Sequence, residues 1–361
     1  MKSFWNTLRK PIMVLAPMAD VTDASFRRVI AKYGKPDVIW TEFVSADGIV
    51  HANAVGRDKL MRDLIFTEAE RPIVAQFFTS KPENMYKAAV LAREMGFDGI
   101  DINMGCPDKG IERQGAGAAM IKNPALAREV IRAAKEGAKG KNARGEVVEL
   151  PVSVKTRIGF NKNELETWLP ELLAEKPAVI TIHARTRKEM SKVPARWEEV
   201  KRAVEIRNAV QVGEENKTLI FGNGDALDLN DAEKKARESG ADGVMLGRAI
   251  FGNPWLFNRD ETRAGGKSAI VVAPEEKLRV LVEHTKLYEE LLGDVKNFAI
   301  MKKHFKAYVN GWEGAKELRM ELMETNNAEE VERIISAYLV KKGRVKKPLF
   351  KAIFSIFGTR K

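Results

Sequence analysis

Residues 218–249 read TLIFGNGDALDLNDAEKKARESGADGVMLGRA. Two short apolar runs, TLIFG at 218–222 and DGVMLG at 242–247, flank a helical pattern over 230–239 that Gly240 is placed to end. The runs are continuously apolar rather than alternating, which indicates strands buried on both faces and therefore parallel strands. The stretch predicts one β/α/β unit.

The same unit recurs toward the N-terminus. Six further apolar runs lie at 12–16, 37–41, 72–78, 99–103, 151–157 and 178–184, with helical patterns at 22–33, 82–95, 124–136 and 196–208. Ser80 and Asn123 are expected helix N-caps, and Gly96 stands where a helix should stop. Eight β/α units in about 250 residues is the size of a (β/α)8 barrel. We therefore predict an α/β fold, a TIM barrel, with an open doubly wound sheet as the alternative.

The pattern changes around residues 260–272, where RDETRAGGKSAI is typical of a linker. Beyond it, 275–292, 295–309, 314–325 and 327–341 have helical patterns, and no run there indicates a strand. We predict a catalytic barrel domain over 1–260, an all-helical domain over 273–340 and a basic C-terminal tail over 341–361. A Gly/Lys-rich stretch at 137–150 is expected to be a solvated insertion.

The amino-acid composition limits which classes of protein this chain can belong to. Hydrophobic residues make up 44% of the 361 residues, so a sizeable core is available. Cys106 is the single cysteine, which excludes an intrachain disulfide and a cysteine-based zinc site and fits a reducing cytosol. The N-terminal MKSFWNTLRKP lacks the apolar segment of a signal peptide, and no apolar run has membrane-spanning length. We expect a cytoplasmic protein without a membrane or metal partner.

The net charge of +11 favours a polyanionic partner, although a basic surface that is merely solvated fits equally well.

Polar residues gather where the predicted strands end, which in a barrel is the end that carries the chemistry. They are Gln76, Asn103, Cys106, Lys155, Arg157, His183 and Arg185. The two last strands end in GNGD (222–225) and LGRA (246–249). Glycines at these two places allow backbone N–H groups to approach a phosphate, and Arg248 adds positive charge. A glycine loop after one strand alone would be interpreted as an ordinary tight turn. Two such loops, after the last two strands of a barrel, together indicate a phosphate site.

A phosphate site beside Lys155 and Gln76 suggests a phosphate-bearing heterocyclic cofactor at the mouth of the barrel. Gln76 has an amide that suits the edge of a flat ring, and flavin mononucleotide (FMN) has one ring and one phosphate. Pyridoxal phosphate, with Lys155 as its Schiff-base lysine, is the competing interpretation. It gives Cys106 no role.

Six motifs in order resemble the tRNA-dihydrouridine synthases, most closely the bacterial B-type branch: APMADVTD, DINMGCP, VKTRIG, TIHARTR, GNGD and GVMLGRAIFGNPWLF. The resemblance runs from about Met13 to Phe257 and implies an FMN-binding barrel followed by a helical domain that recognises RNA. It also implies the reaction. The C5–C6 double bond of a uridine in tRNA is reduced to 5,6-dihydrouridine with NADPH or NADH, by hydride from flavin N5 to C6.

The resemblance also implies roles for residues. The flavin would be bound by Pro17, Met18, Ala19, Gln76, Lys155 and His183, and its phosphate by Asn223, Gly224, Asp225, Gly247 and Arg248. The uracil would be faced by Asn103, Arg157, His183 and Arg185. Cys106 would give a proton to C5, and a thiol with an ordinary pKa of about 8.5 is mostly protonated at neutral pH.

The chain departs from the family pattern at Asp20, where the family often has glycine. Two other functions stay open: a free-pyrimidine oxidoreductase of the dihydroorotate dehydrogenase type, and an RNA-binding protein that uses the barrel only as a scaffold. The tail has eight Lys or Arg and no acid, so it either holds RNA or packs on the barrel or on a membrane surface.

Overall fold

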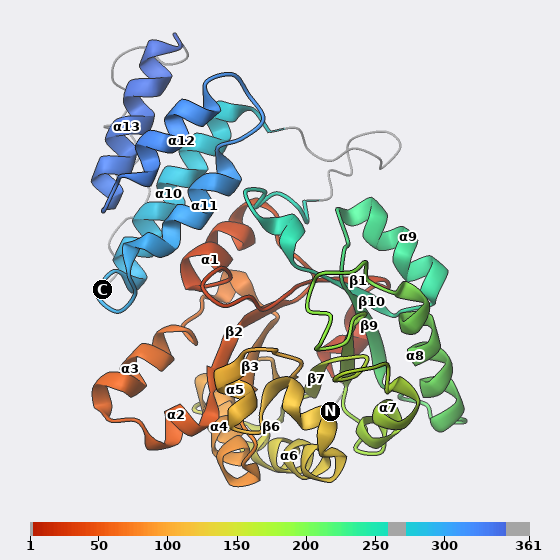
Figure 1. Cartoon of the computed structure of the whole chain (residues 1–361). Coiled ribbons are helices and arrows are strands. Elements are labelled where there is room, and N and C mark those ends of the chain that lie inside the picture. The colour runs from red at the N-terminus through yellow and green to blue at the C-terminus, as the bar shows by residue number, and fades with distance from the viewer. Residues whose placement is uncertain (1–2, 259–271, 344–361) are drawn as a thin grey trace. The chain divides into compact units, whose positions relative to one another are not determined.

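The computed structural model describes residues 3–258 and 272–343, and eight parallel strands form its main sheet. The strands are β1 (Ile12–Leu15), β2 (Ile39–Ser45), β3 (Ile73–Phe78), β4 (Gly99–Met104), β7 (Val152–Arg157), β8 (Val179–His183), β9 (Leu219–Asn223) and β10 (Gly243–Leu246). Their order in the sheet is β1, β10, β9, β8, β7, β4, β3, β2. A parallel bridge between Val14 and Val38 then brings β1 beside the residues that precede β2, so the sheet closes on itself (Figure 1). The predicted TIM barrel is confirmed, and the open doubly wound sheet is wrong.

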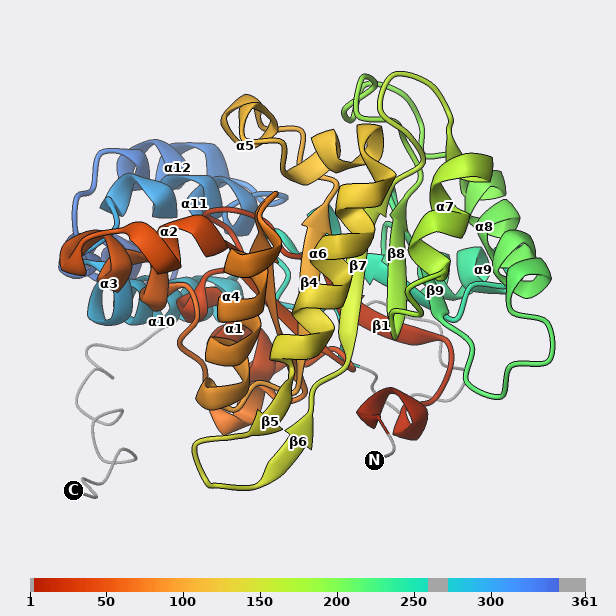
Figure 2. The same cartoon turned by 90° about the horizontal axis from the view of Figure 1, so that it is seen from below.

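Helices alternate with these strands, as the sequence predicts. They are α1 (Ala24–Tyr33), α2 (Ala46–His51), α3 (Ala54–Arg62), α4 (Pro82–Met95), α5 (Lys109–Arg113), α6 (Pro124–Gly137), α7 (Leu165–Leu173), α8 (Trp197–Val210) and α9 (Leu229–Ser239). The stretch expected to be a solvated insertion is an antiparallel hairpin of β5 (Lys139–Lys141) and β6 (Val147–Glu149). In Figure 2 this hairpin and α5 lie at opposite ends of β4 and β7.

The helix ends follow local chemistry, with one exception. The side chain of Asn123 accepts the Leu126 N–H at 3.2 Å and caps α6. Gly96 and Gly240 end α4 and α9 with φ of 79° and 70°, a conformation that costs glycine little. The predicted cap Ser80 is wrong: its hydroxyl donates to the Gln114 carbonyl instead, and Lys81 stands at the N-cap of α4.

A cluster of apolar side chains fills the amino end of the barrel. Trp5, from a short 3-10 turn at Phe4–Thr7, is buried with its ring centroid 5.8 Å from that of Trp40 and 5.7 Å from that of Phe221. Val74 belongs to the same cluster. Gln76 lies two residues further along β3 and faces the same side of the strand. The barrel interior therefore changes from apolar to polar toward its carboxyl end, where the predicted site residues lie.

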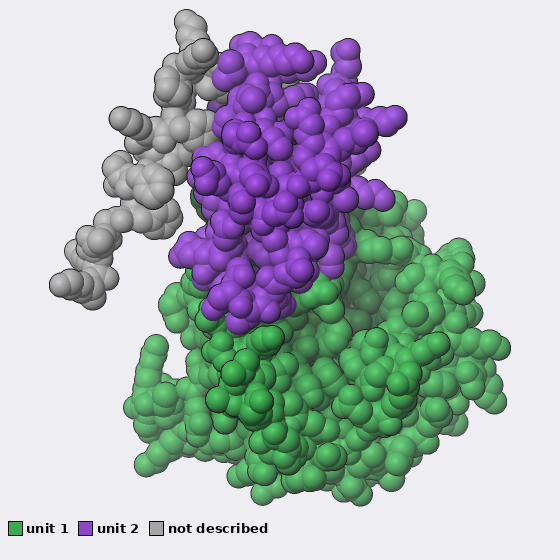
Figure 3. Space-filling view, turned by 60° about the vertical axis from the view of Figure 1, so that its left-hand side comes forward, with its two compact units in different colours: residues 1–250, 254–270 green, residues 251–253, 271–361 purple. Residues whose placement is uncertain are grey.

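The chain divides into two compact units, coloured separately in Figure 3. Residues 1–250 and 254–270 form unit 1, which contains the barrel, and residues 251–253 and 271–361 form unit 2. Unit 2 contains α10 (Pro274–Leu292), α11 (Met301–Tyr308), α12 (Ala315–Met323) and α13 (Ala328–Lys341), and between residues 272 and 343 it has no strand. Of the predicted basic tail, 341–361, residues 344–361 lie outside the described residues. No helix in the described part of the chain is long and apolar enough to cross a membrane.

Candidate active site at the carboxyl end of the barrel

The loop after β4 holds Cys106 through its backbone. The side-chain oxygen of Asn103 accepts the N–H groups of Gly105 at 3.1 Å and of Cys106 at 2.9 Å. The Cys106 carbonyl accepts the Ala118 N–H at 2.9 Å. A Cβ on Gly117, whose φ is 61°, would lie 2.8 Å from that carbonyl oxygen, so only glycine fits this close approach. The loop is thus folded back on itself around the cysteine.

The surroundings of Cys106 keep its thiol protonated. The side chain is half-buried and packs with Phe43, Phe78, Ile111 and Ala116. Burial raises the pKa of the Cys106 thiol, and this outweighs a backbone hydrogen bond from Asp108 that lowers it. The thiol therefore retains its proton at neutral pH, which is the state that a proton donor needs.

A buried network inside the barrel fixes the Gln76 amide. Gln76 Nε2 donates to Asp101 Oδ2 at 2.6 Å, and Asn103 Nδ2 donates to Gln76 Oε1 at 3.1 Å. Ser153 Oγ donates to the other Asp101 oxygen at 2.6 Å. Burial raises the pKa of Asp101 to about 6, although the hydrogen bonds from Ser153 and Gln76 and the charge of Lys155 act in the opposite direction. The sequence interpretation missed Asp101, although an acid inside the apolar run GIDIN was the available signal.

Two cations stand on β7. Burial, and then the neighbouring Arg157, lower the pKa of Lys155 to about 8. Burial lowers the pKa of Arg157 to about 10. The Arg157 guanidinium donates to the carbonyls of Gly105 at 2.8 Å, Thr186 at 3.1 Å and Met190 at 3.2 Å. These contacts connect the Cys106 loop to the loop after β8, so the structure places Arg157 as a support of both loops.

His183 ends β8, Arg185 lies two residues beyond it, and the two form a chain of polar contacts to the loop after β9. One Arg185 nitrogen lies 3.3 Å from His183 Nε2, and another donates to Asp225, whose carboxylate also accepts from Arg248 at 2.6 Å. Burial and then the cations Arg157 and Lys155 hold the pKa of His183 well below its usual range, so the ring is neutral at pH 7. Burial would raise the pKa of Asp225, but the hydrogen bonds from Arg185 and from the Ala195 N–H, together with the charges of Arg185 and Arg248, outweigh it, so the pKa is lowered.

The loops after β9 and β10 offer backbone groups and one exposed arginine to a phosphate. A Cβ on Gly224, whose φ is 125°, would lie 2.8 Å from the Ala195 Cβ, and Trp197 Nε1 donates to the Gly224 carbonyl at 2.8 Å. A Cβ on Gly247 would be in ordinary van der Waals contact with Ala16 Cβ and Met18 Sδ, each at 3.6 Å, so Gly247 lies against the loop after β1. The Arg248 side chain is 66% exposed. Backbone N–H groups and one accessible guanidinium are the donor set that a phosphate takes.

Two predicted phosphate ligands have side chains that are already engaged. Asn223 Nδ2 donates to the Met245 carbonyl at 2.8 Å, which ties β9 to β10. The Asp225 carboxylate accepts from Arg185, Arg248 and the Ala195 N–H. Either residue would therefore contribute its backbone, rather than its side chain, to an anion.

The loop after β1 explains the departure at Asp20. Pro17, Met18 and Ala19 come after β1, separated from it by Ala16. The Met18 carbonyl accepts the N–H of Thr22 at 3.0 Å, and the Met18 N–H donates to Thr22 Oγ1 at 2.9 Å. Asp20 has a φ of 53° and donates its N–H to the Glu42 carboxylate. A left-handed position favours glycine, and aspartate is among the residues that tolerate it.

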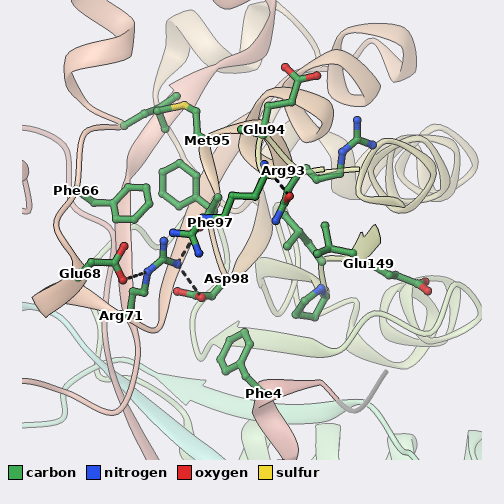
Figure 4. Close-up of a pocket in the computed structure, with 18 of the residues that line it drawn as sticks. Phe4, Phe66, Glu68, Arg71, Arg93, Glu94, Met95, Phe97, Asp98 and Glu149 are labelled. Atoms are coloured by element: carbon green, nitrogen blue, oxygen red, sulfur yellow. Dashed lines mark hydrogen bonds and ion pairs between the residues drawn. The ribbon is translucent and has the colours of Figure 1, made fainter. Parts of the chain in front are cut away.

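A separate cavity of about 770 Å³ lies in unit 1 and contains none of the predicted site residues. It is lined by Phe66, Arg71, Phe97 and residues that precede β4 and β7, including Asp98 and Pro151 (Figure 4). The Arg71 guanidinium is already bound to Glu68 at 2.8 Å and to Asp98 at 2.9 Å. This cavity lies at the amino ends of the strands, and the candidate site is at the opposite end.

Comparisons with known proteins agree on one family. The family model described as "Dihydrouridine synthase (Dus)" matches residues 14–342. A Bacillus subtilis (strain 168) protein named "Probable tRNA-dihydrouridine synthase 2" is 39% identical over 339 residues, which cover 93% of this chain and 97% of that protein. A Staphylococcus aureus (strain COL) protein named "Probable tRNA-dihydrouridine synthase" is 36% identical over 339 residues, 93% of this chain and 96% of that protein.

A solved structure shares the fold. The 2-naphthoyl-CoA reductase complex superimposes with a TM-score of 0.50 at 12% identity, over 71% of this chain and 52% of that chain. At this identity the likeness shows the barrel fold alone.

Proposed function

Because the chain belongs to the dihydrouridine synthase family, we propose that it reduces the C5–C6 double bond of uridines in tRNA, with bound FMN and with NADPH or NADH as the reductant. The match over residues 14–342 and the names of the relatives support the reaction and the tRNA substrate. The observation that carries the proposal on this chain is Cys106, its single thiol, held half-buried by the loop at the end of β4.

The residues present fit FMN. Gly224, Gly247 and Arg248 offer backbone N–H groups and a positive charge to its phosphate. Lys155 and Gln76 would hold its ring, and Pro17, Met18 and Ala19 would line it. Bound there, FMN supplies the hydride that reduces C6 of the uracil. The exposed Arg248 guanidinium, next to Gly247 in the sequence, supports this assignment.

Cys106 holds a proton on Sγ and delivers it to C5 of the uracil. Burial raises the pKa of the thiol, so it is protonated at neutral pH. Asn103 and the loop after β4 set the direction of Sγ through the backbone of Cys106. Solvent returns the proton to the thiolate after each turnover. Addition of hydride at C6 and of a proton at C5 completes the reduction.

His183, being neutral, offers one ring N–H or one lone pair to the uracil or the flavin. Arg185 contacts His183 and Asp225, so we assign it to orienting the imidazole. Arg157 supports the Cys106 loop at the Gly105 carbonyl. Its three bonds to carbonyls use Nε and Nη1, so its predicted contact with the uracil would fall to Nη2.

We assign RNA recognition to the helical domain predicted over 273–340 and catalysis to the barrel domain predicted over 1–260. The net charge of +11 supports a polyanionic substrate. A cytoplasmic location follows from the same proposal, because tRNA is modified there.

The experiment that tests the proposal uses the purified protein, NADPH and tRNA transcribed without modifications. Dihydrouridine adds two hydrogens to a uridine, so mass spectrometry of the digested tRNA detects the product. We expect the mass increase with tRNA and not with free uracil or orotate. Reduction of a free pyrimidine in place of tRNA, or a purified protein carrying pyridoxal phosphate, would overturn the proposal.

A further inference from the structure

An ion pair connects the Cys106 loop to the loop after β8. Glu112 lies on α5, six residues after Cys106, and Arg187 lies two residues after Arg185. Arg187 donates from Nε to one Glu112 oxygen and from a terminal nitrogen to the other. The side chains are 24% exposed for Arg187 and 13% for Glu112. A two-pronged Arg–carboxylate contact that is mostly shielded from water is among the stronger and more directional polar contacts.

Arg187 is itself fixed from a third loop. Its N–H donates to the Gly159 carbonyl at 2.9 Å, in the loop after β7. Its guanidinium lies 5.2 Å from the ring centroid of Phe160, and the ammonium of Lys122 lies 4.0 Å from the same ring. The pair with Glu112 is therefore connected to the loop after β7 as well as to the loop after β8.

Two arginines hold the Cys106 loop, one on each side of the cysteine, in addition to the Asn103 contacts and the bond from Ser80 to the Gln114 carbonyl. Arg157 holds the Gly105 carbonyl immediately before Cys106. Arg187 holds Glu112 after it. Loss of the Glu112 contact would leave the segment after Cys106 held by fewer bonds.

We propose that Glu112 and Arg187 are a positioning pair that fixes Cys106 for proton transfer to the uracil. The proposal rests on the proposed role of Cys106 as the proton donor. Neither residue belongs to the loops after β9 and β10, so the two side chains are not among the predicted phosphate ligands.

Reaction of the thiol with iodoacetamide tests the pair directly. Cys106 is the only cysteine, so the alkylation rate of the holoenzyme reports on this loop without any label. In Glu112→Arg and in Arg187→Glu the loop is released, Cys106 becomes more exposed, and we expect alkylation to be about tenfold faster. The double variant Glu112→Arg/Arg187→Glu restores the pair with reversed charges and should return toward the parent rate. If a charge reversal does not fold, Glu112→Gln, which keeps the shape, serves in its place.

Turnover gives the second readout. We expect kcat for tRNA reduction to fall about tenfold in the single variants and to recover in the double variant, with flavin content and the KM for NADPH unchanged. The matched control is the Arg202–Glu166 pair, which is also two-pronged, at 2.6 and 3.1 Å, but exposed between α7 and α8. Glu166→Arg should change neither readout.

The positioning role of Glu112 and Arg187 would be wrong if Cys106 in the single variants were alkylated at the parent rate. It would also be wrong if Cys106 in the double variant were alkylated as fast as in the single variants. The two proposals fail separately. If the pair controls alkylation but Cys106→Ala still reduces tRNA at the parent rate, the loop attachment stands, and both the proton-donor role and the positioning of a proton donor are wrong.

Discussion

The side chain of Asn103 accepts the backbone N–H of Cys106 at 2.9 Å, so the last polar residue of β4 organises the loop that carries the thiol. The same side chain donates to Gln76 at 3.1 Å. One amide therefore joins the predicted proton donor to the residue predicted to hold the flavin ring. A change in the position of Gln76 would therefore alter the Cys106 loop, and a change in that loop would alter Gln76.

Replacing Cys106 with alanine should leave the fold and the flavin in place and slow the reduction of uridine. Loss of a general acid typically costs about 10²–10⁴-fold, and we expect a loss of kcat in that range. Reduction of the flavin by NADPH, followed by stopped-flow absorbance, should keep the parent rate because the thiol acts on the uracil. Parent-like turnover of tRNA would make Cys106 a packing residue.

Replacing Asn103 with alanine should be more disruptive than its size suggests. The N–H groups of Gly105 and Cys106 and the Gln76 oxygen would all lose their partner, at a cost of about 1–3 kcal/mol for each group left buried without one. We expect a lower melting temperature, slower tRNA reduction and faster alkylation of Cys106. Asn103→Asp keeps the acceptor oxygen for the loop, so it should preserve the alkylation rate while losing the donation to Gln76. Equal alkylation in the parent and in Asn103→Ala would contradict the role of the side chain in the loop.

The strands could be predicted because they are buried on both faces, which leaves continuous apolar runs such as TLIFG and GIDIN. The β5–β6 hairpin could not, because exposed residues such as Lys139 and Glu149 carry no such signal. The positions of the site residues follow from the barrel, since every strand ends at the same rim. Their partners do not: Glu112 and Arg187 are 75 positions apart, and only the folded chain brings them together.

Replacing Arg248 with alanine should weaken flavin binding. A charge-assisted contact to phosphate is worth about 1.5–3 kcal/mol, and the exposure of this side chain favours the lower end, near a tenfold weaker Kd. Flavin content after gel filtration and the Kd from fluorescence quenching measure the change. Arg202→Ala, which removes an exposed arginine on α8, is the control and should retain the flavin. Full occupancy in Arg248→Ala would remove this residue from the phosphate site.

The affinity for FMN should depend on pH through Lys155. Burial lowers the pKa of Lys155 to about 8 in the protein, so its ammonium loses its proton as the pH rises past that value. If FMN binds the charged form, affinity falls above pH 8, by up to about tenfold per pH unit. Lys155→Arg keeps its charge and should bind equally at pH 7 and 9, and Lys155→Met should bind weakly at both. A parent protein whose Kd is flat from pH 7 to 9 would show that the ammonium does not contact the cofactor.

Unit 2 should lose stability in mild acid because of two buried histidines. The rings of His284 on α10 and His304 on α11 lie 4.6 Å apart, edge to face. Burial, and then the charge of Lys303, lower the pKa of His304 to about 3, and burial holds the pKa of His284 well below its usual range. The unfolded chain, with an ordinary histidine pKa of about 6.5, binds more protons below that pH. Stability is therefore complete above pH 6.5 and declines as the pH falls, by up to about 1.4 kcal/mol per pH unit for each histidine.

The comparison of variants isolates this effect from the titration of surface carboxylates, which all variants share. His304→Gln replaces a titrating ring with a neutral polar side chain, so its loss of stability between pH 7 and 5 should be shallower than that of the parent. His51→Gln changes an exposed histidine on α2 and should leave the slope unaltered. Chemical denaturation followed at several pH values measures the three slopes. If His304→Gln and the parent lose stability in parallel, the histidines are protonated in the folded unit and their burial does not govern its acid sensitivity.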